Sequence, residues 1–492
     1  MGRAYSACRA QLCEIGRIDS RVMSLRLYDT MARTVREFTP KTAGMVGVYL
    51  CGATVQSQPH IGHMRSGVSY DVLRRWLTHA GHAVTFVRNV TDIDDKILAK
   101  SVEQNLPWWS LAYANERAFD AGYTALGCLA PTYAPRATGH VPEMIELMDQ
   151  LIGSGHAYTG GDDVFFAVRS FAQYGALSHR QLDDMRAAED ADVTYKRDPR
   201  DFALWKGAKA AEPQSASWNT PWGRGRPGWH LECSAMAGKY LGNEFDIHGG
   251  GPELIFPHHE NEIAQSQAAG RPFARYWVHH ALVNMGGEKM AKSIGNVVSL
   301  PAILSQFRAV EVRYYLAGSH YRSVIDYTPE ALSDAATGYR RLENFVQRAR
   351  QRVGSESSVV TQGARLPVEF SQAMDDDLAT PRALSVVHET ARSGNQALAD
   401  GNDAVAAEAV LGVRAMLNVL GLDPLHEQWQ QSAPGSAAVG QAMDTLVAFV
   451  LQQREAARQH KDYAASDAIR DQLATAGVTL EDTPAGTRWS FS

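Results

Sequence analysis

The spacing of apolar residues changes twice within the first hundred positions. Residues 46–50 form a continuous apolar run, and the segment after it carries Val68, Val72 and Leu73 at helical spacing. A second strand is predicted at 83–90, and a helix follows at 96–104. Apolar strands that alternate with helices are typical of a parallel sheet with crossover helices. The first part of the chain is therefore predicted to be an α/β core.

The pattern changes again further along the chain. After helical stretches at 112–126 and 141–154, residues from about 157 to 228 form short strand-like pieces with many charges, Gly and Pro. We predict that this segment is an insertion between two halves of the sheet. Beyond Tyr321 apolar residues recur near every 3.6 positions, which predicts helices. They are expected at 332–353, 367–373, 380–395 and 404–420.

Composition is that of an ordinary globular protein with several domains. The chain has 492 residues, of which 45% are hydrophobic and 21% charged, and its net charge is −6. No apolar run approaches the roughly 18 residues that a membrane-spanning helix needs, and residues 1–22 contain no apolar signal segment. The five cysteines are too sparse for a disulfide framework, which favours a reducing, cytoplasmic setting.

A tight loop with two histidines separates the first strand from its helix. Imidazoles such as His60 and His63 beside a helix start can bind a polyphosphate, which the helix dipole also favours. Gly62 between them lets a flat group approach the backbone. Taken alone, two solvated histidines at a helix N-terminus are the commoner explanation. A second cationic stretch with Lys289 and Lys292 follows a glycine turn much later.

Polar residues also follow the second predicted strand, 83–90. Thr91 and Asp92 lie at the predicted strand edge, where open α/β sheets bind ligands, and we expect them to face a ligand. Asp94 and Asp95 are predicted instead to begin the next helix, where the helix dipole favours negative charge.

Residues from separate segments form a candidate metal site. Cys51 follows the first strand and Cys233 lies in a later loop, while His258 and Glu262 share one helix face because they are four positions apart. Two thiolates, an imidazole and a carboxylate make a plausible tetrahedral zinc set. His259 is nearly as well placed toward Glu262. From spacing alone, buried structural cysteines beside a helix N-terminal carboxylate are the commoner explanation.

The two nucleotide-binding stretches resemble the HIGH and KMSKS signatures of class I aminoacyl-tRNA synthetases, in the same order. Residues 51–55 (CGATV), 228–236 (GWHLECSAM) and 256–262 (FPHHENE) are similar to the cysteinyl-tRNA synthetase family. The resemblance extends from about Met23 to the C-terminus. It implies that one zinc ion per chain is held by Cys51, Cys233, His258 and Glu262.

The resemblance also implies an activity. It is the activation of L-cysteine with ATP and Mg²⁺ to cysteinyl-adenylate, and transfer of the cysteine to the 3′ end of tRNA(Cys). Zinc would select the substrate thiolate over serine, whose hydroxyl is a poor ligand at neutral pH. The implied residues are His60, His63, Lys289 and Lys292 for catalysis, with Gly62 also at ATP, and Thr54, Thr91, Trp229 and His248 in the cysteine pocket. The sequence departs from KMSKS at Ala291, which replaces the first serine, but both lysines are present.

A division into domains follows from the resemblance. The fold class is α/β: a class I synthetase Rossmann-like catalytic core with an inserted connective domain, followed by an α-helical bundle and a small C-terminal anticodon-binding module. The predicted ranges are 1–22 for a disordered N-terminal extension, 23–125 and 228–330 for the two catalytic halves, 126–227 for the connective insertion, 331–430 for the bundle, 431–440 for a linker and 441–492 for the anticodon-binding module.

The last module carries the residues expected to contact tRNA. Cationic side chains and a terminal indole suit single-stranded bases, and they are Arg454, Arg458, Lys461, Arg470 and Trp489. Acidic residues are at least as numerous there, so this prediction depends on the resemblance. In the helical bundle, residues 375–377 are predicted to form a solvated turn of aspartates, with Thr380 as the cap of the next helix.

Two other functions fit parts of the sequence. A ligase that joins cysteine to an amino sugar would share the zinc and adenylation sites but lack the C-terminal module. A catalytically silent RNA-binding protein derived from a synthetase would not need His60, His63 and Lys292. We therefore expect a cysteine–tRNA ligase that is cytoplasmic, monomeric and not bound to membranes.

Overall fold

The computed structural model describes residues 24–187, 193–289, 298–354, 366–431, 436–483 and 486–491. The chain forms two compact units that divide between His426 and Glu427. The predicted N-terminal extension, 1–22, lies outside the described residues.

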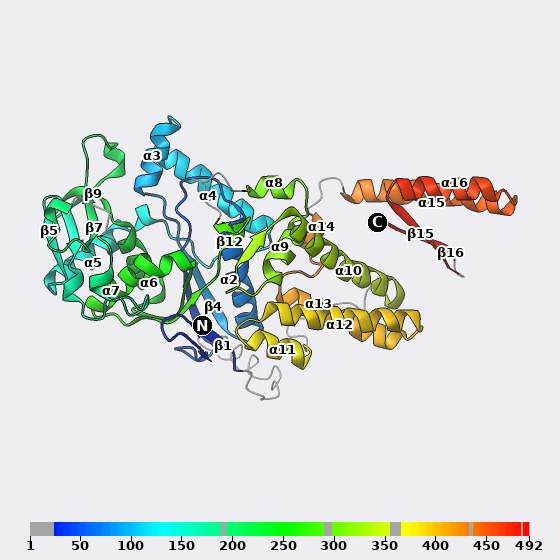
Figure 1. The fold of residues 1–492 in the computed structure, drawn as a ribbon, viewed down its shortest axis with the longest axis horizontal. Helices are drawn as coiled ribbons and strands as arrows, with labels where there is room; N and C mark the ends of the chain where they lie inside the picture. The colour runs from blue at the N-terminus through cyan, green and yellow to red at the C-terminus, as the bar shows by residue number, and fades with distance from the viewer. Residues whose placement is uncertain are drawn as a thin grey trace, which may run out of the picture. The chain divides into compact units, whose positions relative to one another are not determined.

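A parallel four-stranded sheet forms the centre of the first unit. Its strands are β3 (Met45–Leu50), β4 (Ala83–Arg88), β10 (Glu244–Gly250) and β11 (Phe273–His279), in the order β11-β10-β3-β4. Helix α2 (Ile61–His79) connects β3 to β4. Val46, Val48 and Leu50 are buried on one face of β3 and Tyr49 is buried on the other, as expected for a parallel strand that is covered on both sides. The predicted α/β core is confirmed (Figure 1).

The insertion between β4 and β10 contains a separate antiparallel sheet. Its strands are β5 (Ala157–Gly160), β6 (Asp163–Phe166), β7 (Phe202–Gly207), β8 (Trp218–Thr220) and β9 (Gly223–Pro227), in the order β5-β6-β7-β9-β8. Helices α5 (Val141–Gly153) and α6 (Trp229–Leu241) lie beside it, where the chain leaves the core and returns (Figure 1). The segment that the pattern of short strands singled out is thus folded as an insertion.

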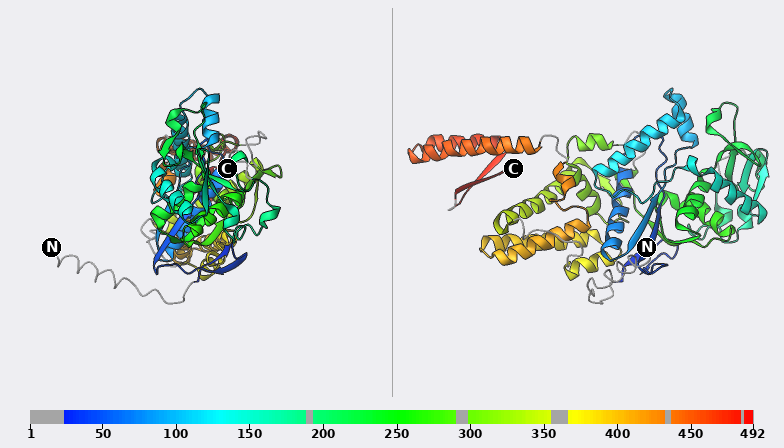
Figure 2. Two further views of the ribbon diagram at one scale, coloured as in Figure 1. Left: turned by 90° about the vertical axis from the view of Figure 1, so that its left-hand side faces the viewer. Right: turned by 180° about the vertical axis from the view of Figure 1, so that it is seen from behind.

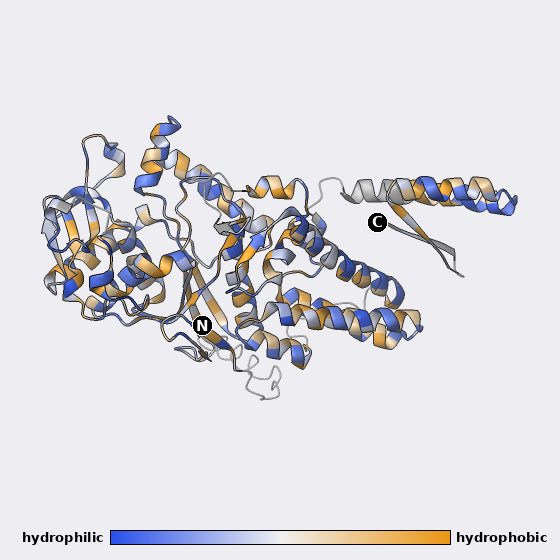
Figure 3. Ribbon diagram, viewed as in Figure 1, coloured by the Kyte–Doolittle hydropathy of each residue, from blue (hydrophilic) through white to orange (hydrophobic). Residues whose placement is uncertain are grey.

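Helices follow the sheet in the first unit. After α8 (Leu300–Leu304), helix α9 (Ala309–Gly318) packs on α2, and four further helices come next (Figure 2). They are α10 (Pro329–Val353), α11 (Val368–Asp375), α12 (Thr380–Ala399) and α13 (Asp403–Val419). Each carries polar and apolar faces, as Figure 3 shows. Their bounds agree closely with the helices that the 3.6-residue spacing predicts.

The aspartate turn between α11 and α12 is not solvated as predicted. Asp377 is only 4% exposed and accepts hydrogen bonds from the Tyr28 N–H at 2.8 Å and the Tyr321 hydroxyl at 2.6 Å. Thr380 is the first residue of α12, and its neighbour Ala379 caps the helix without a side-chain hydrogen bond. The turn was mispredicted because these partners lie far away in sequence.

The second unit is small. It contains α15 (Ser436–Gln459), α16 (Tyr463–Thr475) and a hairpin of β15 (Val478–Thr483) and β16 (Gly486–Phe491) around a core of Val447, Leu473 and Val478. The predicted linker, 431–440, differs from the structure because 436–440 belong to α15. The alanines of this stretch favour a helix more than its Ser and Gly oppose it.

Candidate metal centre and adenylation site

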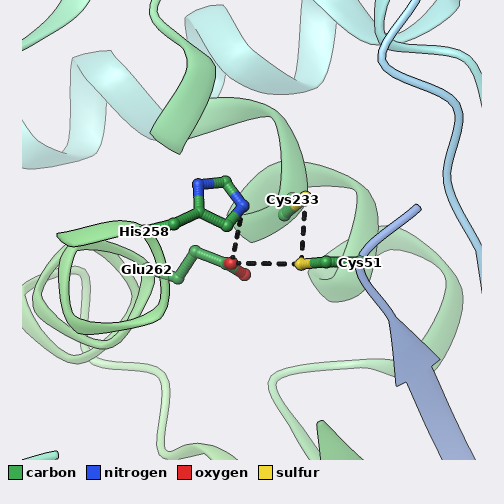
Figure 4. Close-up of side chains that lie close together, drawn as sticks. All are labelled: Cys51, Cys233, His258 and Glu262. Atoms are coloured by element: carbon green, nitrogen blue, oxygen red, sulfur yellow. Dashed lines mark hydrogen bonds and ion pairs between the residues drawn. The ribbon is translucent and has the colours of Figure 1, made fainter. Parts of the chain in front are cut away.

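The four predicted metal ligands lie together although four separate elements carry them. Cys51 directly follows β3, and Cys233 lies on α6. His258 belongs to the turn Ile255–His259 (η7), and Glu262 to α7 (Glu260–Ala268). One donor atom from each lies within 4.8 Å of all the others (Figure 4). Cys51 is held there because its N–H donates to the carbonyl of Gly249 on the neighbouring strand.

The donor atoms are close and shielded from water. The Cys51 Sγ lies 3.6 Å from the Cys233 Sγ and 3.4 Å from the Glu262 Oε1, and the His258 Nε2 lies 3.1 Å from the same oxygen. Cys51 is 8% exposed and the other three side chains at most 1%. This arrangement brings thiols, an imidazole and a carboxylate together without solvent.

The electrostatics of the cluster call for a cation. Burial raises the pKa of the Cys51 thiol, and the neighbouring Cys233 and Glu262 raise it further. Burial also lowers the pKa of His258 well below its usual value, helped by His230 and His248. The imidazole is therefore neutral and free to be a ligand, while the thiols would ionise only beside a positive charge.

Two of the predicted cysteine-pocket residues, Trp229 and His248, contact this cluster. The indole of Trp229 stacks on His258 with 4.1 Å between ring centroids, and the His248 Nε2 lies 2.8 Å from the Glu262 Oε2. Thr54 pairs with Thr91 through a short β-bridge. His248 and His259 form a second possible donor set with Cys51 and Glu262. His259 is also bonded to His279, 2.8 Å away.

Two residues after β4 have roles that the sequence does not indicate. Asp92 was expected to face a ligand, but its carboxylate accepts from the N–H and hydroxyl of Thr138. Thr91 donates its hydroxyl to Glu232 at 3.0 Å, and Glu232 is 1% exposed. We missed Glu232 because its only signal is its position next to Cys233. Asp94 caps α3 (Asp95–Glu103) as predicted, accepting from the Lys96 N–H.

The histidine motif begins α2. The side chain of His60 accepts from the Gly62 N–H, and the His63 ring accepts from the His60 N–H, so the pair caps the helix. Their ring centroids are 3.7 Å apart. His60 also bridges Ser299, which brings the end of the lysine-containing segment beside the histidines. Lys289 ends β13 (Glu288–Lys289), and Lys292 lies outside the described residues.

The cations predicted to bind tRNA are placed differently from one another. Arg458 and Lys461 are exposed at the end of α15, and Arg470 is exposed beside Asp467. Arg454 is only 4% exposed, and Trp489 packs partly buried on the small core of the second unit. Arg454 and Trp489 are therefore largely withdrawn from the surface.

Comparison with known proteins identifies the family. Residues 37–337 match the class I (C) tRNA synthetase catalytic domain, residues 369–424 the DALR domain, and residues 445–489 the cysteinyl-tRNA ligase anticodon-binding domain. The cysteine–tRNA ligase of Streptomyces griseus is 56% identical over 469 residues, covering 95% of this chain and 99% of that protein.

The chain belongs to the cysteine–tRNA ligase family.

A further relative supports this membership, and two solved structures share the fold. The cysteine–tRNA ligase of a Nocardioides species is 55% identical over 96% of this chain and the whole of that protein. Methionyl-tRNA synthetase of Mycobacterium tuberculosis with methionyl-adenylate shares the fold, with a TM-score of 0.57 and 17% identity over 80% of this chain and 96% of that one. A LeuRS–tRNA–LeuAMS complex from Agrobacterium radiobacter K84 superposes with a TM-score of 0.59 at 10% identity. The superposition covers 81% of this chain and 86% of that one.

The predictions of a cysteinyl-tRNA synthetase, its class I fold and an aminoacyl-tRNA ligase activity are confirmed by cysteine–tRNA ligase family membership. A buried Cys/His/Glu cluster able to hold a metal ion is present as well. Within the described ranges, none of the helices is both long and apolar enough to cross a membrane.

Proposed function

We propose that this chain is a cysteine–tRNA ligase in which a zinc ion, held by Cys51, Cys233, His258 and Glu262, selects the thiolate of cysteine over serine. The observation that carries the proposal is the burial of these four donors within 4.8 Å of one another. They come from three stretches that are far apart in the sequence, namely the end of β3, α6, and the continuous segment of η7 and α7, so sequence neighbourhood does not explain their meeting.

The spacing of the donors fits zinc. Tetrahedral bonds of about 2.3 Å to sulfur and about 2.1 Å to oxygen separate two sulfurs by about 3.8 Å, and a sulfur from an oxygen by about 3.6 Å. The corresponding separations are 3.6 Å for Cys51 and Cys233, and 3.4 Å for Cys51 and Glu262. The set with two thiols is also preferred over the set with His248 and His259, because thiolates favour zinc and His259 is engaged by His279.

Selection follows from the chemistry of the substrate side chain. When bound, zinc supplies a position for the thiolate of cysteine, whereas a serine hydroxyl is a much weaker ligand at neutral pH. A hydrophobic pocket alone would separate such near-isosteres by only about 1–3 kcal/mol. We assign Trp229 and His248 to the cysteine pocket because they contact His258 and Glu262 of the donor set. Thr91 and Thr54 are assigned with them, because Thr91 contacts Glu232, the neighbour of Cys233, and pairs with Thr54.

Adenylation is assigned to the two nucleotide motifs. The carboxylate of cysteine attacks the α-phosphate of ATP, that bond forms, and pyrophosphate leaves with the electrons of the broken P–O bond. Charge grows on the leaving phosphates, so Lys292 and Lys289 lower the barrier there, with Mg²⁺ on the triphosphate. His60 and His63 would donate to the nucleotide from the start of α2, where the missing side chain of Gly62 makes room for the His60 ring.

The second unit is assigned to tRNA(Cys). Residues 445–489 match an anticodon-binding domain, which a ligase for an amino sugar would not need. Arg458, Lys461 and Arg470 are exposed and can contact phosphates, whereas Arg454 and Trp489 have largely structural surroundings. We expect a monomer that works in the cytoplasm.

The test is ATP–pyrophosphate exchange with cysteine and with serine, together with zinc analysis, on wild type, Cys233→Ser and Cys128→Ser. Cys128 is the matched control because it is a half-buried cysteine outside the donor set. We expect exchange with cysteine only, one zinc per chain, and loss of both in Cys233→Ser alone. Equal exchange with serine would refute the selection by thiolate, and exchange with neither amino acid would favour a silent RNA-binding protein.

A further inference from the structure

Two large aromatic side chains stand exposed on one face of helix α4 (Trp108–Ala125). Trp109 is 58% exposed and Tyr113 is 55% exposed. They are four positions apart, so they are neighbours on the helix surface, and Arg117 continues the same face one turn later. We call these three residues the α4 strip. Single exposed apolar residues are common, but paired exposed rings followed by a cation indicate a binding surface.

The opposite side of α4 contacts the parts of the catalytic unit that surround the nucleotide motif. The Asn115 amide donates to the Val55 carbonyl at 3.1 Å and accepts from Gln58 at 3.2 Å. The ring of Phe119 lies 4.9 Å from that of His63. At its beginning, the helix meets the insertion, where the Trp108 indole N–H donates to the Ser215 hydroxyl.

The helix also reaches the segment that follows the lysines. A Cβ added to Gly122 would lie 2.9 Å from Leu300 and 3.0 Å from the Met64 sulfur, so α4 packs closely on α8 and α2 there. Helix α4 therefore runs from the insertion, past the histidine motif, to α8. The α4 strip is on its exposed side throughout this path.

The charges around the strip favour a polyanion. Glu116 is matched by Arg136 at 2.8 Å, and Asp120 lies 3.9 Å from Arg88. Arg117 is exposed and makes no ion pair among the residues that the structure describes. The Arg136 guanidinium lies 5.8 Å from the centroid of the Tyr113 ring. Two guanidinium groups thus lie near the aromatic rings, that of Arg136, which is paired with Glu116, and that of Arg117, although the whole chain has a net charge of −6.

We propose that Trp109 and Tyr113 stack on the unpaired nucleotides at the 3′ end of the tRNA, and that Arg117 contacts the backbone phosphate of those nucleotides. Aromatic faces combined with cationic side chains are the usual means of binding single-stranded nucleic acid. The inference rests on the proposed function, because it takes His60 and His63 to mark the position of the adenylate.

The position of the strip selects this part of the tRNA. Ten residues separate Trp109 from Phe119, which is about 15 Å along a helix, and Phe119 contacts His63. The 3′ end must come this close to the adenylate, because it accepts the cysteine. Paired stem regions offer no free base faces, so stacking would not serve them.

The experiment measures tRNA binding with two substrates, intact tRNA(Cys) and the same tRNA without its unpaired 3′ nucleotides. Trp109→Ala and Tyr113→Ala are each expected to weaken binding of intact tRNA about 5- to 100-fold, with no effect on the truncated tRNA. Trp109→Phe keeps an aromatic face and should restore most of the binding. Val102→Ala removes an aliphatic side chain that is 77% exposed on the neighbouring helix α3 and should change nothing.

ATP–pyrophosphate exchange with cysteine separates this inference from the proposed function, since the exchange requires no tRNA and should be unchanged in all these variants. A direct readout comes from 2-aminopurine placed among the 3′ nucleotides, whose fluorescence wild type should quench and Trp109→Ala should not. Equal loss for intact and truncated tRNA, or no loss for either, would overturn the proposal. The proposal would also be overturned if the substitutions at Trp109 and Tyr113 changed only the self-association of the protein and not its binding of tRNA. If Trp109→Ala or Tyr113→Ala also lowered the exchange rate, the fluorescence test on the wild-type protein would decide. In that case, failure of the wild type to quench 2-aminopurine would overturn the proposal.

Discussion

The two oxygens of the Glu262 carboxylate have different partners: one contacts His248 and the other contacts the donor cluster. Its Oε2 lies 2.8 Å from the His248 Nε2, while its Oε1 lies 3.1 Å from the His258 Nε2 and 3.4 Å from the Cys51 Sγ. His248 and Glu262 are both fully buried. His248 therefore fixes the direction in which Glu262 presents its other oxygen, in addition to any contact with the substrate.

Replacing His248 should weaken the metal site without removing a ligand. We expect His248→Ala to lower zinc affinity about 10- to 100-fold, because an unsupported ligand carboxylate loses its orientation. Competition with a chromophoric chelator measures this. The matched control is His140→Gln, which alters a buried histidine bonded to Arg136 and Tyr240 outside the donor set. Wild-type zinc affinity in His248→Ala would disprove the orienting role.

Lys292→Ala tests the adenylation assignment. Removing one preorganised positive group from developing charge costs about 10²- to 10³-fold in rate. We expect a loss of this size in the rate constant of ATP–pyrophosphate exchange, with unchanged zinc content and cysteine affinity. Lys289→Ala should have a smaller effect. A rise in the KM for cysteine at an unchanged rate constant would instead place Lys292 in substrate binding.

Periodicity predicted the elements well because local interactions determine them. Helices α10 to α13 begin and end within a few residues of the predicted ranges, and β3 and β4 lie close to the strands predicted at 46–50 and 83–90. The approach of Cys51 to Cys233 could not be derived in this way. It depends on the pairing of β3 with β10, which lies beyond the insertion. Only the resemblance to a family brought those cysteines together in advance.

Predictions failed where a polar side chain has a distant partner. Asp377 was expected in solvent, but it accepts from the Tyr28 N–H, 349 positions away in sequence. Asp92 was expected to face a ligand, but Thr138 occupies both of its carboxylate oxygens. No local pattern distinguishes such an aspartate from a solvated or catalytic one, since the partner is chosen by the tertiary fold.

The buried pair of Arg313 and Asp71 should be important for stability. Arg313 on α9 lies 2.5 Å from Asp71 on α2 and also donates to the carbonyls of Leu126 and Leu420. Its side chain is 0% exposed. We expect Arg313→Leu to lower the free energy of unfolding by about 3 kcal/mol, because two buried carbonyls lose their donor and the buried Asp71 keeps only Arg75 and the Leu129 N–H.

Urea unfolding followed by circular dichroism measures this loss. The matched control is Arg352→Ala, which removes an arginine that is 51% exposed and pairs at 2.9 Å with Asp403, itself 52% exposed. Exposed pairs contribute about 0–1 kcal/mol, so the control should change stability little. Similar losses in the free energy of unfolding for the two substitutions would show that the buried pair between α2 and α9 contributes no more to stability than an exposed pair.

Asp95 should give the chain an acid-sensitive contribution to stability. Burial opposes its ionisation, but Lys206 at 2.7 Å and the buried Arg226 outweigh this and lower its pKa to about 2. The unfolded chain, with a pKa of about 3.9, therefore takes up the proton first as the pH falls. The stabilisation is complete above about pH 5, falls to about half near pH 3 and is lost below pH 2.

Asp95→Asn measures this contribution. Because the Asp95 side chain is 52% exposed, solvent screening reduces the effect, and we expect a loss of about 1 kcal/mol in the free energy of unfolding at pH 7. The difference from wild type should shrink between pH 5 and pH 3. Asp120→Asn is the control, since Asp120 is similarly exposed but 3.9 Å from Arg88. A difference that stays constant down to pH 3 would mean that the amide disturbs the helix start, where Asp95 is the first residue of α3, and not the ion pairs.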